Sequence, residues 1–273
     1  MKKIFGIVGN PINHSLSPIL HNYWLNKYNI DANYSLISTA EEKLFDVIEK
    51  IRNKIIYGVN ITLPYKQKII PFLDKIVNDA ETTGSVNTVF LDNNSSIVGE
   101  NTDVFGLQAA YLKEMENGQN KKALVLGAGG VSPSVILSLQ KSGIKSISIT
   151  NRTEEKCLFL KRKFNYLNVL HWKNLQSEIE NYDVIINATS LGLKGGQDFD
   201  FDFEKCRNNS IYIDTIYNPL KTKTFKFLED KGIKVFNGLD MFIYQGQKSF
   251  YLWNKINPEI DNDLINLLLS KLK

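Results

Sequence analysis

Short apolar runs alternate with amphipathic stretches along the first half of the chain. Apolar runs bounded by polar residues predict strands, and apolar positions three and four residues apart predict helices. On this pattern we expect strands at 4–8, 34–38, 57–61, 86–91 and 97–100, and helices at 17–28, 41–52 and 102–115. Ser17 should cap the first of these helices, with Pro18 in its first turn, and Thr102 or Asp103 should cap the third. The polar run at 92–96 predicts a β-hairpin.

From Lys122 onwards the alternation becomes regular. Strands are expected at 123–126, 146–150, 184–188, 211–214 and 233–236, and helices at 131–141, 154–164 and 222–231. Repeated strand–helix units at this spacing predict a parallel, doubly wound sheet. Two further helices, at about 240–253 and 261–272, close the chain. The polar segment 116–120 is the most loop-like part of the sequence, and we expect a boundary there.

The composition is that of a globular protein. Hydrophobic residues make up 43% and charged residues 23% of the 273 positions, which disfavours disorder, collagen and coiled coil. The net charge of +4 and the pI of about 8.8 make the chain mildly basic. This pI is below the value above about 9 that is typical of a dedicated nucleic-acid-binding domain. Most of the positive charge is lysine, which an AT-rich genome would also produce. The chain has four arginines, Arg52, Arg152, Arg162 and Arg207.

Membrane proteins and disulfide or metal scaffolds are also disfavoured. No apolar run approaches the ~18–20 residues of a membrane span. The apolar run after Lys2 and Lys3 is too short for a signal peptide, and Pro11 follows it. Cys157 and Cys206 are isolated thiols without CxxC spacing or a nearby histidine. We therefore expect a cytoplasmic protein with no membrane partner, no nucleic-acid partner and no bound metal.

A glycine turn follows the first strand of the second series. Gly127, Ala128, Gly129, Gly130 and Val131 lie between that strand and the start of a helix. Glycines at such a turn let backbone N–H groups approach a pyrophosphate at the helix N-terminus. A purely structural strand–helix turn is the alternative for this segment taken alone.

The next strand ends at Asn151, Arg152 and Thr153. An NAD site normally places Asp or Glu at this point to bind the ribose 2′-hydroxyl. A carboxylate would repel a 2′-phosphate, whereas a guanidinium can pair with it through two hydrogen bonds. The sequence therefore predicts NADP as the cofactor, and an ordinary surface arginine is the alternative.

Polar side chains gather at the predicted strand ends of the first half. Ser15 and Ser17 offer hydroxyls, and 60–66 supplies an amide, a hydroxyl and an ammonium group. Segments 85–88 and 101–103 add amides and a carboxylate. Turn chemistry explains any one of these segments. The four together suit a small polyhydroxylated ligand better.

These segments resemble the shikimate dehydrogenase family. The matching segments are GNPINHSLSP (9–18), NITLPYK (60–66), SVNT (85–88), GENTD (99–103), GAGG (127–130), NRT (151–153), NATSLG (187–192), DTIYNP (214–219) and NGLDMFIYQGQKSFYLW (237–253). They follow in order across almost the whole chain, so the resemblance is specific, although GAGG alone would not be.

The resemblance implies an α/β enzyme of two domains that reduces 3-dehydroshikimate to shikimate with NADPH. That reaction belongs to chorismate and aromatic amino-acid biosynthesis. An N-terminal α/β substrate domain is expected at 1–102 and 238–273, and a Rossmann-like, doubly wound NADP domain at 103–237. The C-terminal helices would thus return to the first domain.

The family's functional residues carry over onto matching positions of this chain. Its catalytic pair falls on Lys66, as proton donor and oxyanion stabiliser, and on Asp103, as the partner of Lys66. The implied substrate-binding residues are Ser15, Ser17, Asn60, Thr62, Asn87, Tyr217 and Gln245. The implied cofactor-binding residues are Gly127, Ala128, Gly129, Gly130, Val131, Asn151, Arg152, Thr153, Thr189 and Gly238, of which the last two fall near the nicotinamide end.

A few positions depart from the family pattern. Ser132 and Pro133 stand in the helix start where Ala-rich and Arg-containing sequences are more common. Leu193 replaces a frequent Met, and Phe242 replaces a frequent Leu. These departures concern how the cofactor packs.

Two other functions remain open at this point. One is an NAD-using quinate/shikimate dehydrogenase, which the Asn-Arg pair at 151–152 disfavours. The other is a non-catalytic ligand-binding relative, which the presence of both Lys66 and Asp103 disfavours. The expected partner is the small-molecule substrate, and the sequence leaves monomer and homodimer open.

Overall fold

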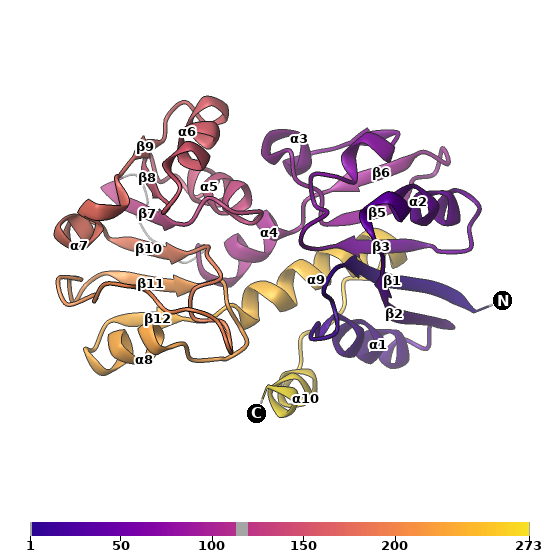
Figure 1. Ribbon diagram of the computed structural model, residues 1–273. Helices are drawn as coiled ribbons and strands as arrows, with labels where there is room; N and C mark the ends of the chain where they lie inside the picture. Colours follow the sequence, from indigo (N-terminus) through magenta and orange to yellow (C-terminus); the bar gives the residue numbers. More distant parts are fainter. Residues whose placement is uncertain (1, 113–119, 273) are drawn as a thin grey trace. The chain divides into compact units, whose positions relative to one another are not determined.

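The structure is a computed structural model that describes residues 2–112 and 120–272. The chain divides into two compact units, labelled by their elements in Figure 1. The first unit comprises Met1–Gly106 and Ile243–Lys273, and the second comprises Leu107–Phe242. The first unit is therefore assembled from both ends of the sequence.

The unit boundaries lie close to, but not at, the positions expected from the sequence. We expected them at 102/103 and 237/238, and the chain divides after Gly106 and after Phe242. The second boundary falls inside helix α9 (Leu239–Asn254). Most of the expected boundary segment at 116–120 lies outside the described residues.

The first unit is built on a six-stranded sheet with the order β2-β1-β3-β5-β6-β4. Its strands are β1 (Lys3–Gly9), β2 (Ala32–Ser38), β3 (Gly58–Ile61), β4 (Lys75–Ile76), β5 (Thr88–Leu91) and β6 (Ile97–Glu100). β1 runs parallel to β2 and β3, whereas β5 runs antiparallel to β3 and β6. The predicted hairpin is confirmed. The register pairs Asn60 with Thr88, and Thr88 with Glu100, so three polar segments meet at one end of the sheet.

Helices lie against this sheet, namely α1 (Ser17–Lys27), α2 (Leu44–Arg52), α3 (Asp79–Thr83) and the later part of α9, whose Trp253 ring stacks on Phe5 of β1. α10 (Asn262–Lys271) packs on α1. α4 (Asp103–Leu107) follows β6, and its last residue, Leu107, belongs to the second unit. α2 buries Leu44, Val47, Ile48 and Ile51, which confirms the helical spacing of those residues. The cap predicted for α1 is wrong, because Leu16 is the N-cap and Ser17 is already helical.

The helix expected at 102–115 is irregular. After α4 the chain continues through a π-helical stretch, Gln108–Leu112. The rest of the expected helix, from 113 onwards, lies outside the described residues.

The second unit is a doubly wound α/β sheet, as predicted. Its strands are β7 (Lys122–Leu126), β8 (Ser146–Thr150), β9 (Asn168–Val169), β10 (Val184–Asn187), β11 (Ile211–Asp214) and β12 (Lys234–Phe236). All are parallel, in the order β12-β11-β10-β7-β8-β9. The strand order reverses direction at β7, and ligands of such sheets bind at the carboxyl ends of the strands beside that point.

Both faces of the second sheet are buried. Along β7, Ala123 and Val125 belong to one apolar cluster, while Leu124 and Leu126 belong to another. The covering helices include α5 (Ser132–Lys141), α6 (Glu154–Lys163), α7 (Leu175–Glu178) and α8 (Lys223–Asp230). Four successive buried apolar positions, 123–126, are what a parallel sheet covered on both faces requires.

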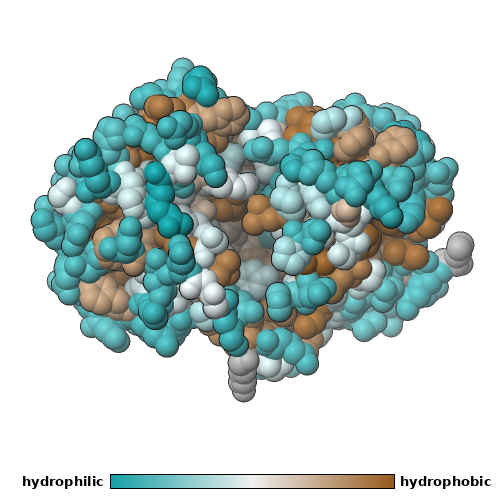
Figure 2. All heavy atoms as spheres, viewed as in Figure 1, coloured by the Kyte–Doolittle hydropathy of each residue, from teal (hydrophilic) through white to brown (hydrophobic). Residues whose placement is uncertain are grey.

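The visible surface is mixed. Figure 2 shows many hydrophilic residues with hydrophobic ones scattered among them. Among residues 2–112 and 120–272, no helix has both the length and the apolar character needed to cross a lipid bilayer.

Candidate functional site

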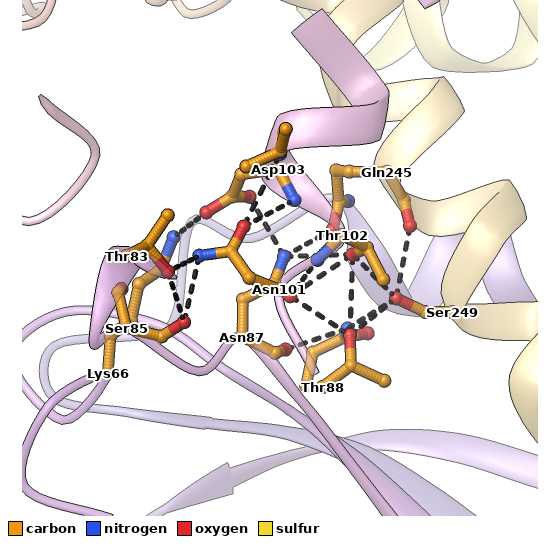
Figure 3. Close-up of polar contacts among 12 residues, drawn as sticks. Lys66, Thr83, Ser85, Asn87, Thr88, Asn101, Thr102, Asp103, Gln245 and Ser249 are labelled. Carbon is orange, nitrogen blue, oxygen red and sulfur yellow. Dashed lines mark hydrogen bonds and ion pairs between the residues drawn. The ribbon is translucent and has the colours of Figure 1, made fainter. Parts of the chain in front are cut away.

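Lys66 and Asp103 form an ion pair in the first unit (Figure 3). Lys66 Nζ lies 2.6 Å from Asp103 Oδ2, and the two side chains are 14% and 8% exposed. At this burial the charges attract each other with less screening than on an open surface. Within the described part of the chain, the Lys66 ammonium has this one side-chain partner. Two of its three N–H donors therefore remain available to a ligand.

A fixed turn directly after β3 carries Lys66. The N–H of Tyr65 donates to the carbonyl of Thr62 at 2.9 Å, and the N–H of Val86 donates to the carbonyl of Lys66 at 2.8 Å. The Tyr65 ring is buried, and its hydroxyl donates to the carbonyl of Thr39 at 2.9 Å. The lysine stem thus starts from a backbone that is tied to neighbouring segments on both sides.

Asp103 is the first residue of α4. The side-chain oxygen of Asn101 accepts hydrogen bonds from the N–H groups of Asp103 (3.1 Å) and Val104 (3.3 Å), which is the capping role. Thr102, one of the two residues predicted to cap this helix, directly precedes it, and its carbonyl accepts from the N–H of Gly106 at 3.0 Å, but the side chain that accepts from the free N–H groups is that of Asn101. Because Asn101 caps the helix, the Asp103 carboxylate is free to bind Lys66.

The Asn87 amide fixes the other side of this carboxylate. Its Nδ2 donates to Asp103 Oδ1 at 2.8 Å and to Thr102 Oγ1 at 2.9 Å, while its Oδ1 accepts from the N–H of Thr102 at 2.7 Å. Gln245 Oε1, from α9, lies 3.4 Å from Asn87 Nδ2 (Figure 3). A buried amide that uses both its donor and its acceptor has one favourable orientation. The carboxylate orientation follows from it.

Asn60, near the end of β3, is the centre of a second buried network. Its Oδ1 accepts from the hydroxyl of Tyr34 at 2.7 Å, and its Nδ2 donates to Thr88 Oγ1 at 3.2 Å and to Ser249 Oγ at 3.0 Å. The Thr88 and Ser249 hydroxyls lie 2.8 Å apart, and both also contact Thr102 Oγ1. The two networks are therefore continuous.

An aromatic stack supports Asn60 from α1. The His21 ring lies on the Tyr34 ring, with centroids 4.3 Å apart and an interplanar angle of 9°. Burial lowers the pKa of His21 to about 3, so the imidazole is neutral at physiological pH. Burial also raises the pKa of the Tyr34 phenol well above its usual value. The Tyr34 hydroxyl therefore stays protonated as the donor to Asn60.

The two serines expected to bind substrate lie together at the start of α1. Ser15 Oγ donates to Ser17 Oγ at 3.1 Å and accepts from the N–H of Ser17 at 3.2 Å. Thr62 follows β3, and its N–H donates to the carbonyl of Val8 at 2.9 Å. Tyr217 belongs to the second unit, where its ring stacks on Phe242 at 4.8 Å between centroids. The substrate role of each of these residues stays a prediction.

The glycine turn of the second unit leaves room beside its backbone. Gly127 has φ +103°, and a Cβ there would lie 2.9 Å from the carbonyl oxygen of Ala188, so the position requires glycine. At Gly129 a Cβ would meet nothing nearer than that oxygen, at 3.9 Å. Ser132 Oγ closes the turn by accepting from the N–H of Gly129 and donating to the carbonyl of Gly127, both at 2.9 Å. Val131 is the N-cap position of α5.

Asn151 ties the glycine turn to the end of β8. Its Oδ1 accepts from the N–H of Ala128 at 3.3 Å, and its Nδ2 donates to the carbonyl of Thr153 at 2.9 Å. Arg152 is exposed and donates to Gln197 Oε1 at 3.2 Å. Among the residues placed by the structure, no carboxylate pairs with Arg152. The open space at Gly129, the N-terminus of α5 and this cation together fit a dinucleotide with a 2′-phosphate.

Thr189 and Gly238, expected near the nicotinamide end, lie in loops after β10 and before α9. Thr189 Oγ1 donates to Asn187 Oδ1 at 2.6 Å. The N–H of Gly238 donates to the carbonyl of Ile216 at 2.8 Å. Both residues are thus held by groups at the carboxyl ends of β10 and β11.

Comparison with known proteins decides the family. The family model described as "Shikimate dehydrogenase substrate binding domain" matches residues 7–89. The family model described as "Shikimate / quinate 5-dehydrogenase" matches residues 110–193. The chain is 45% identical over 268 residues to the shikimate dehydrogenase (NADP(+)) of Pelagibacter ubique, covering 98% of this chain and 99% of that protein. The chain belongs to the shikimate dehydrogenase family.

Solved structures of shikimate dehydrogenases share the whole fold. The enzyme from Aquifex aeolicus matches with a TM-score of 0.89 at 32% identity, covering 100% of this chain and 98% of that one. The enzyme from Thermus thermophilus, described in complex with NADP(H) and shikimate, matches with a TM-score of 0.88 at 29% identity, covering 99% and 100%. The family and the two-domain α/β fold expected from the sequence are confirmed.

Sequence reasoning missed several members of the polar networks in this shikimate dehydrogenase fold. Tyr34, Thr88, Thr102 and Ser249 carry hydrogen bonds of the Asn60 and Asn87 networks, yet none was predicted as a site residue, although Thr88 and Thr102 lie in segments that were singled out. For Ser249 a signal existed, because it is a small polar residue among aromatic neighbours in a helix, and it is fully buried. For Thr88 and Thr102, strand and turn propensities gave an adequate local explanation.

Proposed function

We propose that this chain catalyses the reversible, NADPH-dependent reduction of 3-dehydroshikimate to shikimate. The observation that carries this proposal is the Lys66–Asp103 ion pair at 2.6 Å, set at the edge of a buried amide network in the first unit. Family membership supports the reaction, and the relatives named above include an NADP(+) enzyme and an NADP(H)–shikimate complex.

Reduction of a ketone adds a hydride to the carbonyl carbon and a proton to the oxygen. NADPH, when bound, supplies the hydride. Negative charge develops on the oxygen as the hydride arrives, and a donor already aimed at that oxygen stabilises the transition state. Lys66 has two N–H donors to offer there and, as general acid, transfers the proton that completes the alcohol. In the reverse direction the neutral amine takes up that proton.

Asp103 holds the ammonium in place and accepts a hydrogen bond from a substrate hydroxyl. Its Oδ2 binds Lys66, and its Oδ1 is oriented by Asn87. The hydroxyls of Ser15 and Ser17 are suited to a carboxylate, because they are adjacent donors on one turn. The amides Asn60, Asn87 and Gln245, with Thr62, would orient the ring hydroxyls.

The two units take separate tasks in this proposal. The first unit, with the Lys66 site, binds the substrate, and the second, with the glycine turn, binds NADP. Arg152 pairs with the 2′-phosphate, since the position carries no acidic group that would favour NAD. An NAD-using quinate dehydrogenase is the rival, and it predicts the opposite cofactor and substrate preference.

The direct test is absorbance at the reduced-nicotinamide band with purified protein. Shikimate with NADP⁺ should give turnover, while shikimate with NAD⁺ and quinate with either cofactor should give much less. A preference for NAD⁺ would overturn the role of Arg152. Absence of turnover with every pair would overturn the enzymatic assignment.

Lys66→Ala tests the catalytic pair. We expect kcat to fall by about 10²- to 10⁴-fold, the usual contribution of a general acid, with a modest change of KM because the loss is confined to the transition state. The matched control is Lys68→Ala, which removes an exposed lysine two positions away that pairs with Glu41. Equal kcat values for the two variants would contradict the proposed mechanism.

Arg152→Ala tests the cofactor contact. We expect KM for NADP⁺ to rise about 10- to 100-fold, the value of a charged hydrogen-bonded contact, and KM for NAD⁺ to stay as in the wild type. Arg162→Ala, at an exposed arginine of α6, is the matched control. A parallel rise for both cofactors would mean that Arg152 does not read the 2′-phosphate.

A further inference from the structure

A buried carboxylate, Asp214, lies at the carboxyl end of β11 and has no part in the proposed chemistry. It is 1% exposed. Its Oδ1 accepts from Asn187 Nδ2 at 3.1 Å and from the N–H of Ile216 at 3.0 Å, while its Oδ2 accepts from Thr222 Oγ1 at 3.0 Å. Burial is expensive for such a group, and it raises the pKa of Asp214 to about 6. Hydrogen bonds from three separate segments offset that cost.

One of these segments leads to Thr189. Asn187 is fully buried, and with Nδ2 directed at Asp214 its Oδ1 accepts from both the N–H (3.0 Å) and the Oγ1 (2.6 Å) of Thr189. Thr189 Oγ1 in turn accepts from the N–H of Leu191 at 2.9 Å, and Asn187 Nδ2 also donates to the Leu191 carbonyl at 3.1 Å. The Thr189 side chain therefore has its position set through Asn187 by Asp214.

A second segment leads to Gly238. Asp214 Oδ1 binds the N–H of Ile216, and the carbonyl of Ile216 accepts from the N–H of Gly238 at 2.8 Å. A methyl group at Gly238 would overlap the Thr215 carbonyl, so the loop before α9 is in close contact with the segment that follows β11. Thr215 itself donates through Oγ1 to the carbonyl of Asn187 at 2.8 Å. Both loops expected at the nicotinamide end thus depend on the same carboxylate.

The adenine end is held differently. Asn151 bridges Ala128 and Thr153, and Ser132 closes the glycine turn. Among the hydrogen bonds of the described residues, none joins the side chains of Asn151 or Ser132 to that of Asp214. Loss of Asp214 should therefore disturb one end of the cofactor site and leave the other in place.

We propose that Asp214 is a positioning residue for the nicotinamide half of NADP, acting through Asn187 on Thr189 and through Ile216 on Gly238. The inference rests on the proposed function, since it assumes that NADP binds the second unit. Asp214 touches no reacting atom. Its contribution is to hold two loops at the accuracy that hydride transfer demands, where a displacement of about 1 Å can cost roughly 100-fold in rate.

The test compares Asp214→Ala with the matched control Ser210→Ala. Ser210 lies just before β11, is buried, and donates to the carbonyl of Tyr182 at 2.8 Å, so its loss removes a buried hydrogen bond far from both loops. Two readouts are needed: kcat with shikimate and NADP⁺, and the Kd of adenosine 2′,5′-bisphosphate by calorimetry. This ligand carries the adenosine and the 2′-phosphate but no nicotinamide.

We expect Asp214→Ala to lower kcat about 10- to 100-fold, with the bisphosphate Kd unchanged. Ser210→Ala should keep both values. Asp214→Asn retains an oxygen that can accept from Asn187 and Ile216. Its NH₂ group can donate to the Thr222 hydroxyl, which can accept, so this variant should restore most of kcat. Wild-type kcat in Asp214→Ala would overturn the inference, and so would a bisphosphate Kd that rises in step with the fall of kcat.

Two further arms complete the experiment. If Asp214→Ala does not fold, Asn187→Ala breaks the same link from the other side, and wild-type kcat in that variant overturns the inference equally. The wild-type arm tests the proposed function by itself. An inactive wild-type protein that still binds the bisphosphate would refute the reaction, whereas an active wild type with an unaffected Asp214→Ala would refute only the positioning role.

Discussion

Replacing His21 with phenylalanine should make the first unit more resistant to acid than it is in the wild-type protein. The imidazole is fully buried, and it packs against Tyr34 at 4.3 Å and Trp253 at 5.2 Å between ring centroids. Burial lowers the pKa of His21 from 6.5 to about 3. Phenylalanine retains an aromatic ring at this place and has no proton to gain.

The direction and size of this effect of pH on the free energy of unfolding follow from proton linkage. In the unfolded chain the imidazole gains a proton below pH 6.5, while in the folded unit it stays neutral down to about pH 3. The part of the free energy of unfolding that depends on the neutral His21 is therefore fully present above pH 6.5, and it is lost as the pH falls from 6.5 towards 3. pH 5.0 lies 1.5 units below the pKa of the unfolded imidazole. Protonation of the unfolded state there lowers the free energy of unfolding by about 2 kcal/mol, at roughly 1.4 kcal/mol per unit.

The assay is urea unfolding at pH 7.5 and pH 5.0, followed by tryptophan fluorescence. Trp24 and Trp253 lie in the first unit beside His21, and Trp172 is the one tryptophan of the second unit. A Trp172→Phe background therefore makes the fluorescence report the first unit alone. Between the two pH values, the free energy of unfolding should fall by about 2 kcal/mol more with His21 than with His21→Phe.

The change with pH, and not the absolute stability, is the quantity that decides. A larger ring could cost about 1–3 kcal/mol in packing at both pH values, and that constant cost cancels in the difference. His14→Gln, at an exposed histidine of the same unit, is the matched control and should follow the wild type. Equal acid losses for His21→Phe and the wild type would refute the claim that the buried imidazole stays neutral.

Three further changes test other parts of the molecule. A methyl group in Gly58→Ala would overlap the indole of Trp253, so we expect a loss of about 1–3 kcal/mol in urea unfolding of the first unit, and an unchanged midpoint would contradict this packing. Gly127→Ala forces alanine to φ +103° and towards the carbonyl of Ala188, which should raise the Kd of NADP⁺ at least tenfold by calorimetry, since left-handed strain alone costs about 1–2 kcal/mol. Asp261→Ala removes the N-cap of α10, whose carboxylate accepts from the N–H of Leu264 at 2.8 Å, and should cost about 1 kcal/mol in thermal unfolding.

The regular parts of the fold followed from the sequence because their patterns are local. The apolar spacing of α2 and the strand–helix repeats of the second unit each arise within a few residues, and the structure confirms them. The short elements β4, α3, β9 and α7 escaped prediction, since two to five residues are too few to show a period. Tertiary contacts determine their structure instead.

Caps and networks were harder for a related reason. Ser17 has the chemistry of an N-cap, yet Leu16 occupies that place, and Asn101 caps α4 from two positions before the helix. Spacing by itself does not say which of several polar neighbours points at the free N–H groups. Ser249 contacts Asn60 across 189 positions, and no local pattern carries a contact of that range.

The discontinuous first unit has a consequence for the order of events during synthesis. The N–H of the Trp24 indole finds its acceptor in the carbonyl of Glu259, and the hydroxyl of Tyr23 binds Asp261 across 238 positions. A chain growing from its N-terminus must leave those groups unpaired until almost all of it has been made, whereas residues 107–242 are available earlier. Because domains fold as units during synthesis, the second unit should become protease-resistant first, and released chains truncated after residue 242 should show a protected second unit beside a digestible first one.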